Sequence, residues 1–148
     1  MNGINGMKPV RILLVEDSEA DVRLTKEALK ESKLKIGLDV VNDGVAAIEF
    51  LRKSDKYADK ERPDLIILDL NLPMKDGREV LAEIKTDLDL KRIPVVIMTS
   101  SKAEEDIVRC YNNHANCYIT KPIDLNKFIE VVKSIEDFWF TIVKLPGK

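Results

Sequence analysis

Two kinds of segment alternate along the chain. Short apolar runs without a polar interruption are typical of strands that are buried on both faces, as in the middle of a parallel sheet. Leu65-Ile66-Ile67-Leu68 is the clearest of these runs. We expect five strands, at Val10–Val15, Ile36–Val41, Leu65–Leu68, Val95–Met98 and Cys117–Ile119.

Each run is followed by a longer segment in which apolar residues recur at helical spacing. In the first of these segments the spacing directs Leu24, Ala28 and Leu29 inward, and in the fourth it directs Val108 and Tyr111 inward. Ser18 or Asp17 can cap a first helix that runs to about Ser32. The other helices are predicted over Val45–Lys53, Gly77–Thr86 and Ala103–Asn112, and from near Asp124 to about Phe138.

Strands that alternate with helices predict an α/β fold, with helices on both faces of a parallel sheet. Right-handed crossovers then bring the carboxyl ends of all the strands to one edge. Four of the five predicted strands end in charged or hydroxyl groups, namely Glu16-Asp17, Asp69, Thr99 and Lys121. Ligands bind at this edge in open α/β sheets, so we expect the functional site here.

Asp69 is the residue around which this site is organised. It directly follows the most apolar run, and Pro73 and Gly77 interrupt regular structure just beyond it. A lone carboxylate at the end of a buried strand is costly unless another group compensates its charge. From these residues alone, a simple turn-capping role for Asp69 is an equally good interpretation.

The group as a whole suits phosphoryl transfer to a carboxylate. Glu16, Asp17 and Asp69 would repel one another unless a cation lay among them, and Mg²⁺ prefers such oxygen ligands. The charges of Mg²⁺ and Lys121 balance those of the three carboxylates, so a phosphoryl group can enter and Asp69 can act as the nucleophile. Thr99 offers a hydroxyl donor to another oxygen. Because aspartate is ionised near pH 7, no general base is needed.

The set Glu16-Asp17, Asp69 with Pro73 and Gly77, Thr99-Ser100 and Lys121-Pro122 resembles the receiver domain of two-component response regulators. The resemblance covers about residues 8–137. It implies a flavodoxin-like, doubly wound (βα)5 fold with a five-stranded parallel sheet in 2-1-3-4-5 order. It also implies a signalling protein without an enzyme's own substrate, which takes its phosphoryl group from a sensor histidine kinase or a phosphotransfer protein.

The same resemblance assigns roles to single residues. Asp69 matches the phosphoacceptor, and Thr99 and Lys121 match the groups that assist the transfer. For the metal, Mg²⁺ with Mn²⁺ as an alternative, it implies Asp17, Asp69 and the backbone carbonyl of Asn71 as ligands. Glu16 stands where many relatives have aspartate, and is expected to act through water. Thr99 and Tyr118 match the pair that switches conformation after phosphorylation.

Composition supports this interpretation and sets its limits. The chain has 148 residues with 24 basic and 26 acidic ones, a balance that argues against a dedicated nucleic-acid binder. No apolar run approaches the roughly 18 residues of a membrane span, and we see no secretory signal. Cys110 and Cys117 do not form a Cys-x-x-Cys pair, so we expect thiols in a reducing cytoplasm. A receiver attached to a DNA-binding output domain would be expected to continue beyond Lys148. The chain instead resembles a stand-alone receiver, and its loop Ser54–Arg62 and its ending resemble those of the regulators that accompany bacterial phytochromes.

The end of the chain carries surplus apolar residues. We divide the chain into a flexible tail (residues 1–8), a receiver domain (9–138) and an apolar extension (139–148). Surplus apolar surface usually marks an interface, so we expect a homodimer. Two alternatives stay open: the extension folds back on its own domain, or the surface docks a kinase or target. The expected interface residues are Val131, Phe138, Phe140, Ile142 and Val143.

Two other classes of protein are less consistent with the sequence. A phosphatase of the haloacid-dehalogenase type needs a second aspartate two residues after its nucleophile, where this chain has Asn71. A dinucleotide-binding module needs a glycine-rich turn after its first strand, where this chain has Glu16-Asp17-Ser18.

Overall fold

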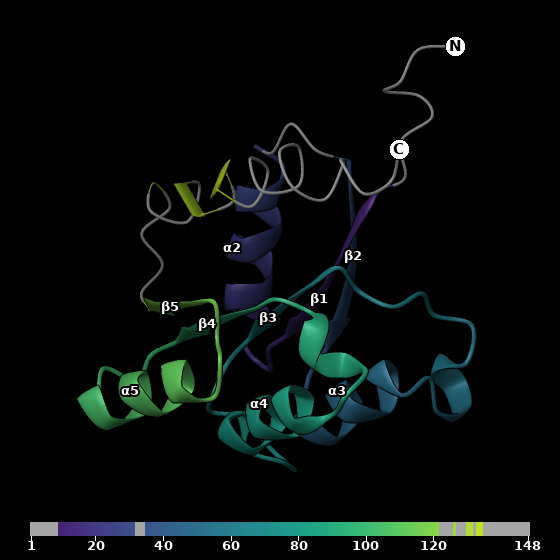
Figure 1. Ribbon diagram of the computed structural model, residues 1–148. Helices are drawn as coiled ribbons and strands as arrows, with labels where there is room; N and C mark the ends of the chain where they lie inside the picture. The colour runs from purple at the N-terminus through teal and green to yellow at the C-terminus, as the bar shows by residue number, and fades with distance from the viewer. Residues whose placement is uncertain (1–8, 32–34, 122–125, 127–129, 132, 135–148) are drawn as a thin grey trace.

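The computed structural model describes residues 9–31, 35–121, 126, 130–131 and 133–134. They form one parallel sheet in the order β2-β1-β3-β4-β5, which confirms the predicted fold class and strand order (Figure 1). The apolar runs predicted all five strands, and β4 and β5 each extend one residue further than expected. The strands are β1 (Val10–Val15), β2 (Ile36–Val41), β3 (Leu65–Leu68), β4 (Val95–Thr99) and β5 (Cys117–Thr120).

Side-chain caps define where most of the helices begin. The Ser18 hydroxyl accepts a hydrogen bond from the Asp21 N–H, and the carboxylates of Asp43 and Asp76 cap the next two helices in the same way. The first helix ends at Leu29, before the predicted end near Ser32. The helices are α2 (Glu19–Leu29), α3 (Gly44–Leu51), α4 (Gly77–Thr86) and α5 (Glu104–Asn112), with short 3₁₀ turns at Asp55–Tyr57 and Leu90–Arg92.

The sheet separates two hydrophobic cores. Helix α2 covers one face, whereas α3, α4 and α5 cover the other (Figure 1). Strand residues alternate between the two cores, because successive side chains of a strand point to opposite faces. In β1, for example, Leu13 packs toward α3–α5 and Leu14 packs toward α2. Both faces of β1, β3 and β4 are therefore buried, as their uninterrupted apolar runs predicted.

Three apolar residues that helical spacing assigned to the interior lie on the surface. Leu24, Val108 and Tyr111 are 48%, 50% and 47% exposed. In α2 the buried positions are Thr25, Ala28 and Leu29, so the prediction was right for Ala28 and Leu29, and Thr25 is buried where Leu24 was expected. Helix α5 buries only Cys110. Packing on the sheet, rather than the apolar stripe alone, sets which face points inward.

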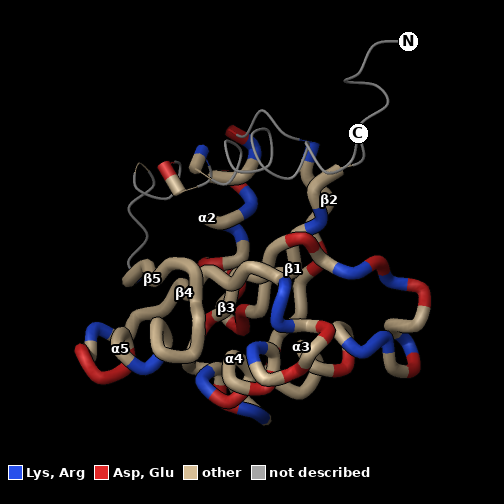
Figure 2. The backbone as a smooth tube through the Cα atoms, in the orientation of Figure 1, with Lys and Arg blue, Asp and Glu red and all other residues tan. Residues whose placement is uncertain are grey.

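The charged residues lie mostly outside this core. Figure 2 shows lysine, arginine, aspartate and glutamate along α3, α4, α5 and the segment after α3, whereas β3 and β4 are almost free of them. Of the expected interface residues, the structure describes only Val131, which is helical and half-buried. Phe138, Phe140, Ile142 and Val143 lie outside the described residues, so the proposed domain limits and interface stay predictions.

Candidate functional site

Strand pairing brings the predicted site residues together. Val15 pairs with Leu68, so the next residues, Glu16 and Asp69, leave neighbouring strands at the same edge. At the other side of the site, the Lys121 N–H donates to the Thr99 carbonyl at 2.7 Å. The carboxyl ends of β1, β3, β4 and β5 thus converge, as the topology of a parallel sheet requires.

The Lys121 ammonium is at the centre of the cluster. It donates to Glu16 Oε1 at 2.6 Å, to Asp21 Oδ2 at 2.7 Å and to Asp69 Oδ2 at 3.0 Å. Its side chain is only 11% exposed. Burial alone would lower the pKa of Lys121, but the hydrogen bonds that it donates to Asp21, Glu16 and Asp69 outweigh burial and raise it. The lysine therefore carries a fixed positive charge at neutral pH.

Asp69 is buried and held from two sides. Its Oδ1 accepts a hydrogen bond from the Asn71 N–H at 3.2 Å, and its Oδ2 accepts the one from Lys121. The backbone after Asp69 packs closely on the start of α4, because a Cβ atom at Gly77 would lie 2.1 Å from the Asp69 carbonyl oxygen. Only glycine permits this approach. Gly77 thus lets the start of α4 lie directly against the backbone of Asp69.

Glu16 is the most deeply buried carboxylate of the site, with 1% of the residue exposed. Its Oε2 accepts from the Ser18 N–H at 3.1 Å. Burial raises the pKa of Glu16 to about 7, against the lowering effect of its bonds to Lys121 and Ser18, and the charge of Asp69 raises it further. A second cation in the site would favour the charged form.

The donor set fits a divalent metal ion. Glu16, Asp17 and Asp69 each offer a carboxylate oxygen, and the three atoms lie within 4.8 Å of one another. Asp17 is exposed, whereas the other two are buried, so the group opens to solvent on one side. All the donors are hard oxygens, which Mg²⁺ and Mn²⁺ prefer. Asn71 is near through its N–H bond to Asp69, but nothing in this geometry assigns a role to its carbonyl group.

Thr99 and Tyr118 lie on adjacent strands next to this cluster. Thr99 is fully buried, and none of the residues that the structure describes gives its Oγ1 a hydrogen-bond partner. The Tyr118 hydroxyl donates to the Ser101 carbonyl at 2.9 Å. Burial raises the pKa of Tyr118, which keeps this donor protonated. An unpaired buried hydroxyl is costly, so Thr99 is ready to accept a new partner.

A second ion cluster, which sequence reasoning missed, holds the loop after Thr99. Arg78 in α4 donates to both oxygens of Asp106 in α5, with Nε–Oδ1 and Nη2–Oδ2 distances of 2.8 and 2.7 Å. The Ser101 hydroxyl also donates to Asp106, at 2.6 Å. The hydrogen bond from Arg78 lowers the pKa of Asp106, and the one from Ser101 adds to this. No motif in the sequence pairs these distant residues.

Comparison with known proteins agrees with the geometry. Residues 12–133 match the family described as the response regulator receiver domain. The chain belongs to this family. It is 53% identical over 139 residues to the response regulator Rcp1 of Synechocystis sp., a match that covers 94% of this chain and 95% of Rcp1. The chain is thus a phosphoacceptor of two-component signalling, as the four strand-end motifs predicted.

Two solved structures are close to this fold. The phosphorylated cyanobacterial phytochrome response regulator RcpA and the Mn²⁺-bound form of Rcp1 each have a TM-score of 0.80 and 52% identity. In both comparisons, 90% of this chain and 96% of the other are covered. The acidic cluster of this receiver thus fits the binding of a divalent metal. Among the helices in the described part of the chain, none is long and apolar enough to cross a membrane.

Proposed function

We propose that Asp69 is the phosphoacceptor of this receiver. The single observation that carries this assignment is the Lys121 bond to Asp69 Oδ2, which aims a buried cation at a carboxylate of the acidic cluster. Glu16 is less suitable, because it is more deeply buried than Asp69. Asp17 is exposed, and among the residues that the structure describes no lysine or hydroxyl donates a hydrogen bond to its carboxylate.

The reaction transfers a phosphoryl group from a phosphohistidine. One Asp69 carboxylate oxygen attacks the phosphorus and forms a new O–P bond, while the P–N bond breaks and its electron pair stays on the imidazole nitrogen. Lys121 moves one N–H from Asp69 to an oxygen of the incoming group. The Thr99 hydroxyl, which lacks a partner among the described residues, donates to another oxygen. Both residues thereby stabilise charge on the transferred group.

Mg²⁺ is the preferred metal in this proposal, with Mn²⁺ as an alternative. Asp17 and Asp69 would bind it directly, the Asn71 carbonyl would supply a third ligand, and Glu16 would act through water. The bound ion supplies positive charge beside the transferred oxygens. The cluster of three carboxylate oxygens within 4.8 Å supports this assignment. Assisted phosphorylation and dephosphorylation of Asp69 then both depend on the metal.

Thr99 and Tyr118 couple phosphorylation to the surface. When the Thr99 hydroxyl moves toward the phosphoryl group, it pulls on the loop that contains Ser101. The Tyr118 hydroxyl is bonded to the Ser101 carbonyl, so the ring must follow or lose this bond. The change reaches α5 through the bond between Ser101 and Asp106.

The partners follow from this signalling role. A sensor histidine kinase or a phosphotransfer protein supplies the phosphoryl group, and the free thiols of Cys110 and Cys117 are consistent with a cytoplasmic location. The surplus of apolar residues in the sequence between Val131 and Val143 supports a homodimer. Sedimentation at micromolar concentration, with and without acetyl phosphate, tests the dimer.

The phosphoacceptor assignment is tested with acetyl phosphate and Mg²⁺. Wild-type protein should gain one base-labile phosphoryl group, and tryptic mass spectrometry should locate it on Asp69. Asp69→Asn should gain none, whereas Asp64→Asn, a matched change just before β3, should label normally. Equal labelling of Asp69→Asn and wild type would reject the assignment.

A further inference from the structure

Asp21 occupies a helix-capping position but does not cap the helix with its side chain. Ser18 is the N-cap of α2, and Asp21 is the third residue of the helix. In a capping box, the acidic side chain at this position accepts from the backbone N–H of the cap residue. Here the Ser18 N–H donates to Glu16 Oε2 instead. The carboxylate of Asp21 is therefore not needed for the cap.

That carboxylate contacts Lys121 instead. The Lys121 Nζ lies 2.7 Å from Asp21 Oδ2, a bond that joins the start of α2 to the end of β5. The backbone of Asp21 is fixed independently, because its N–H donates to the Ser18 hydroxyl and its carbonyl accepts from Thr25 Oγ1 at 2.8 Å. Helix α2 thus presents a charged group to the lysine from a rigid position.

The three carboxylates that bind Lys121 differ in their other roles. Glu16 and Asp69 belong to the carboxylate cluster that fits a metal, and Asp69 must also receive the phosphoryl group. Asp21 is not a member of that cluster. It is thus the partner that can keep its bond to Lys121 while the other two bind the metal and the phosphoryl group.

We propose that Asp21 is the positioning residue of Lys121, holding the ammonium at the site while Glu16 and Asp69 are released for the metal and the phosphoryl group. This inference rests on the proposed roles of Asp69 and Lys121. Without the Asp21 carboxylate, Lys121 would bind only the two groups that the reaction requires. Metal binding and phosphorylation would then each have to break those bonds with no alternative partner for the lysine.

Asp21 also changes the charge balance expected from the sequence. Three carboxylates are balanced by a divalent ion and Lys121, but Asp21 adds a fourth negative charge. In Asp21→Asn that charge is lost, and Lys121 binds Glu16 and Asp69 more tightly. The lost charge and the tighter lysine bonds both lower the affinity for the metal.

The first measurement is the affinity of the unphosphorylated protein for Mn²⁺, followed by electron paramagnetic resonance. We expect Asp21→Asn to weaken binding about five- to tenfold, because a charged hydrogen bond is redirected onto the metal's own ligands. In a Lys121→Met background the same substitution should weaken binding no more than about twofold, by charge alone. An equal loss in both backgrounds would overturn the proposal.

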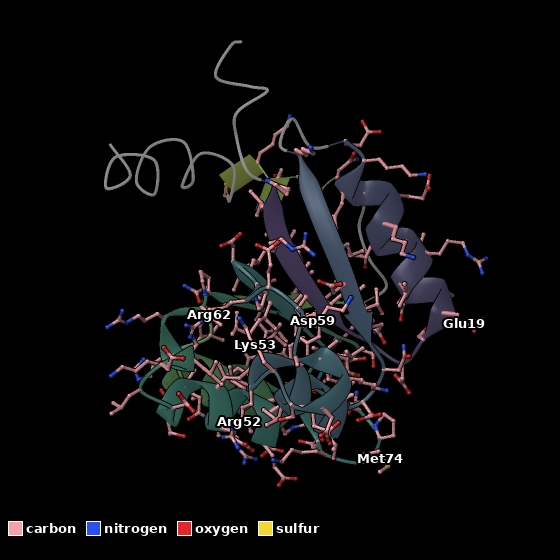
Figure 3. The ribbon with its side chains drawn as sticks, turned by 90° about the vertical axis from the view of Figure 1, so that its right-hand side faces the viewer. Glu19, Arg52, Lys53, Asp59, Arg62 and Met74 are labelled. Atoms are coloured by element: carbon pink, nitrogen blue, oxygen red, sulfur yellow. The ribbon has the colours of Figure 1, made fainter. Side chains whose placement is uncertain are left out.

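Glu19→Gln is the matched control. Glu19 lies in the same first turn of α2, is exposed, and extends away from the fold (Figure 3). The substitution removes the same charge from the same helix end without a contact to Lys121. It should change Mn²⁺ affinity by less than about twofold. A loss in Glu19→Gln as large as in Asp21→Asn would attribute the effect to net charge and reject the positioning role.

The second measurement is the rate of phosphorylation by acetyl phosphate at saturating Mg²⁺. Asp21→Asn should slow it about three- to tenfold, and Asp21→Glu, which keeps the carboxylate, should restore most of the rate. An unchanged or faster rate in Asp21→Asn would overturn the inference. If the wild-type protein is not labelled on Asp69, the proposed function fails instead, and the Mn²⁺ comparison still tests the Asp21–Lys121 coupling.

Discussion

Two ion clusters at the same edge of the sheet differ in how well their charges are matched. Lys121 serves Glu16, Asp21 and Asp69, and its side chain and those of Glu16 and Asp69 are 11%, 1% and 6% exposed. Arg78 donates two hydrogen bonds to the carboxylate of Asp106, and the side chain of its second partner, Asp76, is 38% exposed. The first cluster buries an excess of negative charge, whereas the second forms a paired scaffold.

One carboxyl group in each cluster has a shifted pKa, and the two shifts run in opposite directions. Burial raises the pKa of Glu16 to about 7, because too little positive charge faces it. The bonds from Arg78 and Ser101 lower the pKa of Asp106 well below its usual range. Excess buried negative charge favours the binding of a metal ion, and with it of a phosphoryl group. A matched ion pair instead holds the loop after Thr99 in place. The difference separates the reactive end of the sheet from the part that transmits the signal.

The largest effect is expected on the rate of phosphorylation, when the basic residue of each cluster is replaced by the other basic type. Lys121→Arg places a planar, five-donor group where a compact ammonium serves three carboxylates, and phosphorylation by acetyl phosphate should slow at least about tenfold. Arg78→Lys removes the paired bonds to Asp106 and should change the rate by less than about threefold. Both rates are measured under the same Mg²⁺ concentration. If Arg78→Lys slowed the reaction as much as Lys121→Arg, the separation of the two clusters would be wrong.

The reactive cluster was predictable from sequence and the scaffold was not, for a physical reason. Residues that directly follow apolar strands, such as Asp69 and Lys121, are brought together by the topology of a parallel sheet whatever the loops do. Arg78 and Asp106 meet only because of how α4 and α5 pack and how their long side chains turn, which no local pattern encodes. Asp21 belongs with the second case, because its bond to Lys121 depends on how the start of α2 lies against the end of β5.

Neutralising one aspartate in each cluster should change stability in opposite directions. Without metal, Asp69→Asn relieves repulsion with Glu16 and should raise the free energy of unfolding by about 1 kcal/mol. Asp106→Asn weakens the bonds to Arg78 and should lower it by about 1–2 kcal/mol. Urea unfolding in the presence of a chelator measures both. A loss of stability in Asp69→Asn would show that its cluster is also a matched scaffold.

The ion pair between Arg78 and Asp106 should contribute less to the free energy of unfolding in acid. The pKa of Asp106 is lowered in the folded protein from its ordinary value of 3.8, so the charged form is favoured by folding. Its stabilisation is therefore complete above about pH 5 and declines as the pH falls below about 4. The difference in unfolding free energy between wild type and Asp106→Asn should be constant from pH 5 to 7 and shrink toward pH 3.5. A difference that grew in acid would contradict the assigned ion pair.

The smallest effect on stability is expected for Tyr118, whose hydroxyl contacts the segment between the two clusters. Thr99 ends the strand at the reactive cluster, and two residues later Ser101 accepts from Tyr118 through its carbonyl and donates to Asp106 through its hydroxyl. Tyr118→Phe removes one neutral hydrogen bond and should lower the unfolding free energy by about 0.5–1.5 kcal/mol, with an unchanged rate of phosphorylation.

The same variant tests whether Tyr118 carries the signal between the clusters. Amide NMR shifts of residues 100–112 are compared before and after acetyl phosphate is added, in wild type and in Tyr118→Phe. If the bond to Ser101 couples the clusters, the phosphorylation-dependent shifts in α5 should shrink in the variant while those next to Asp69 stay the same. Equal shifts in α5 for both proteins would mean that the signal reaches this helix without Tyr118, through the link from Ser101 to Asp106.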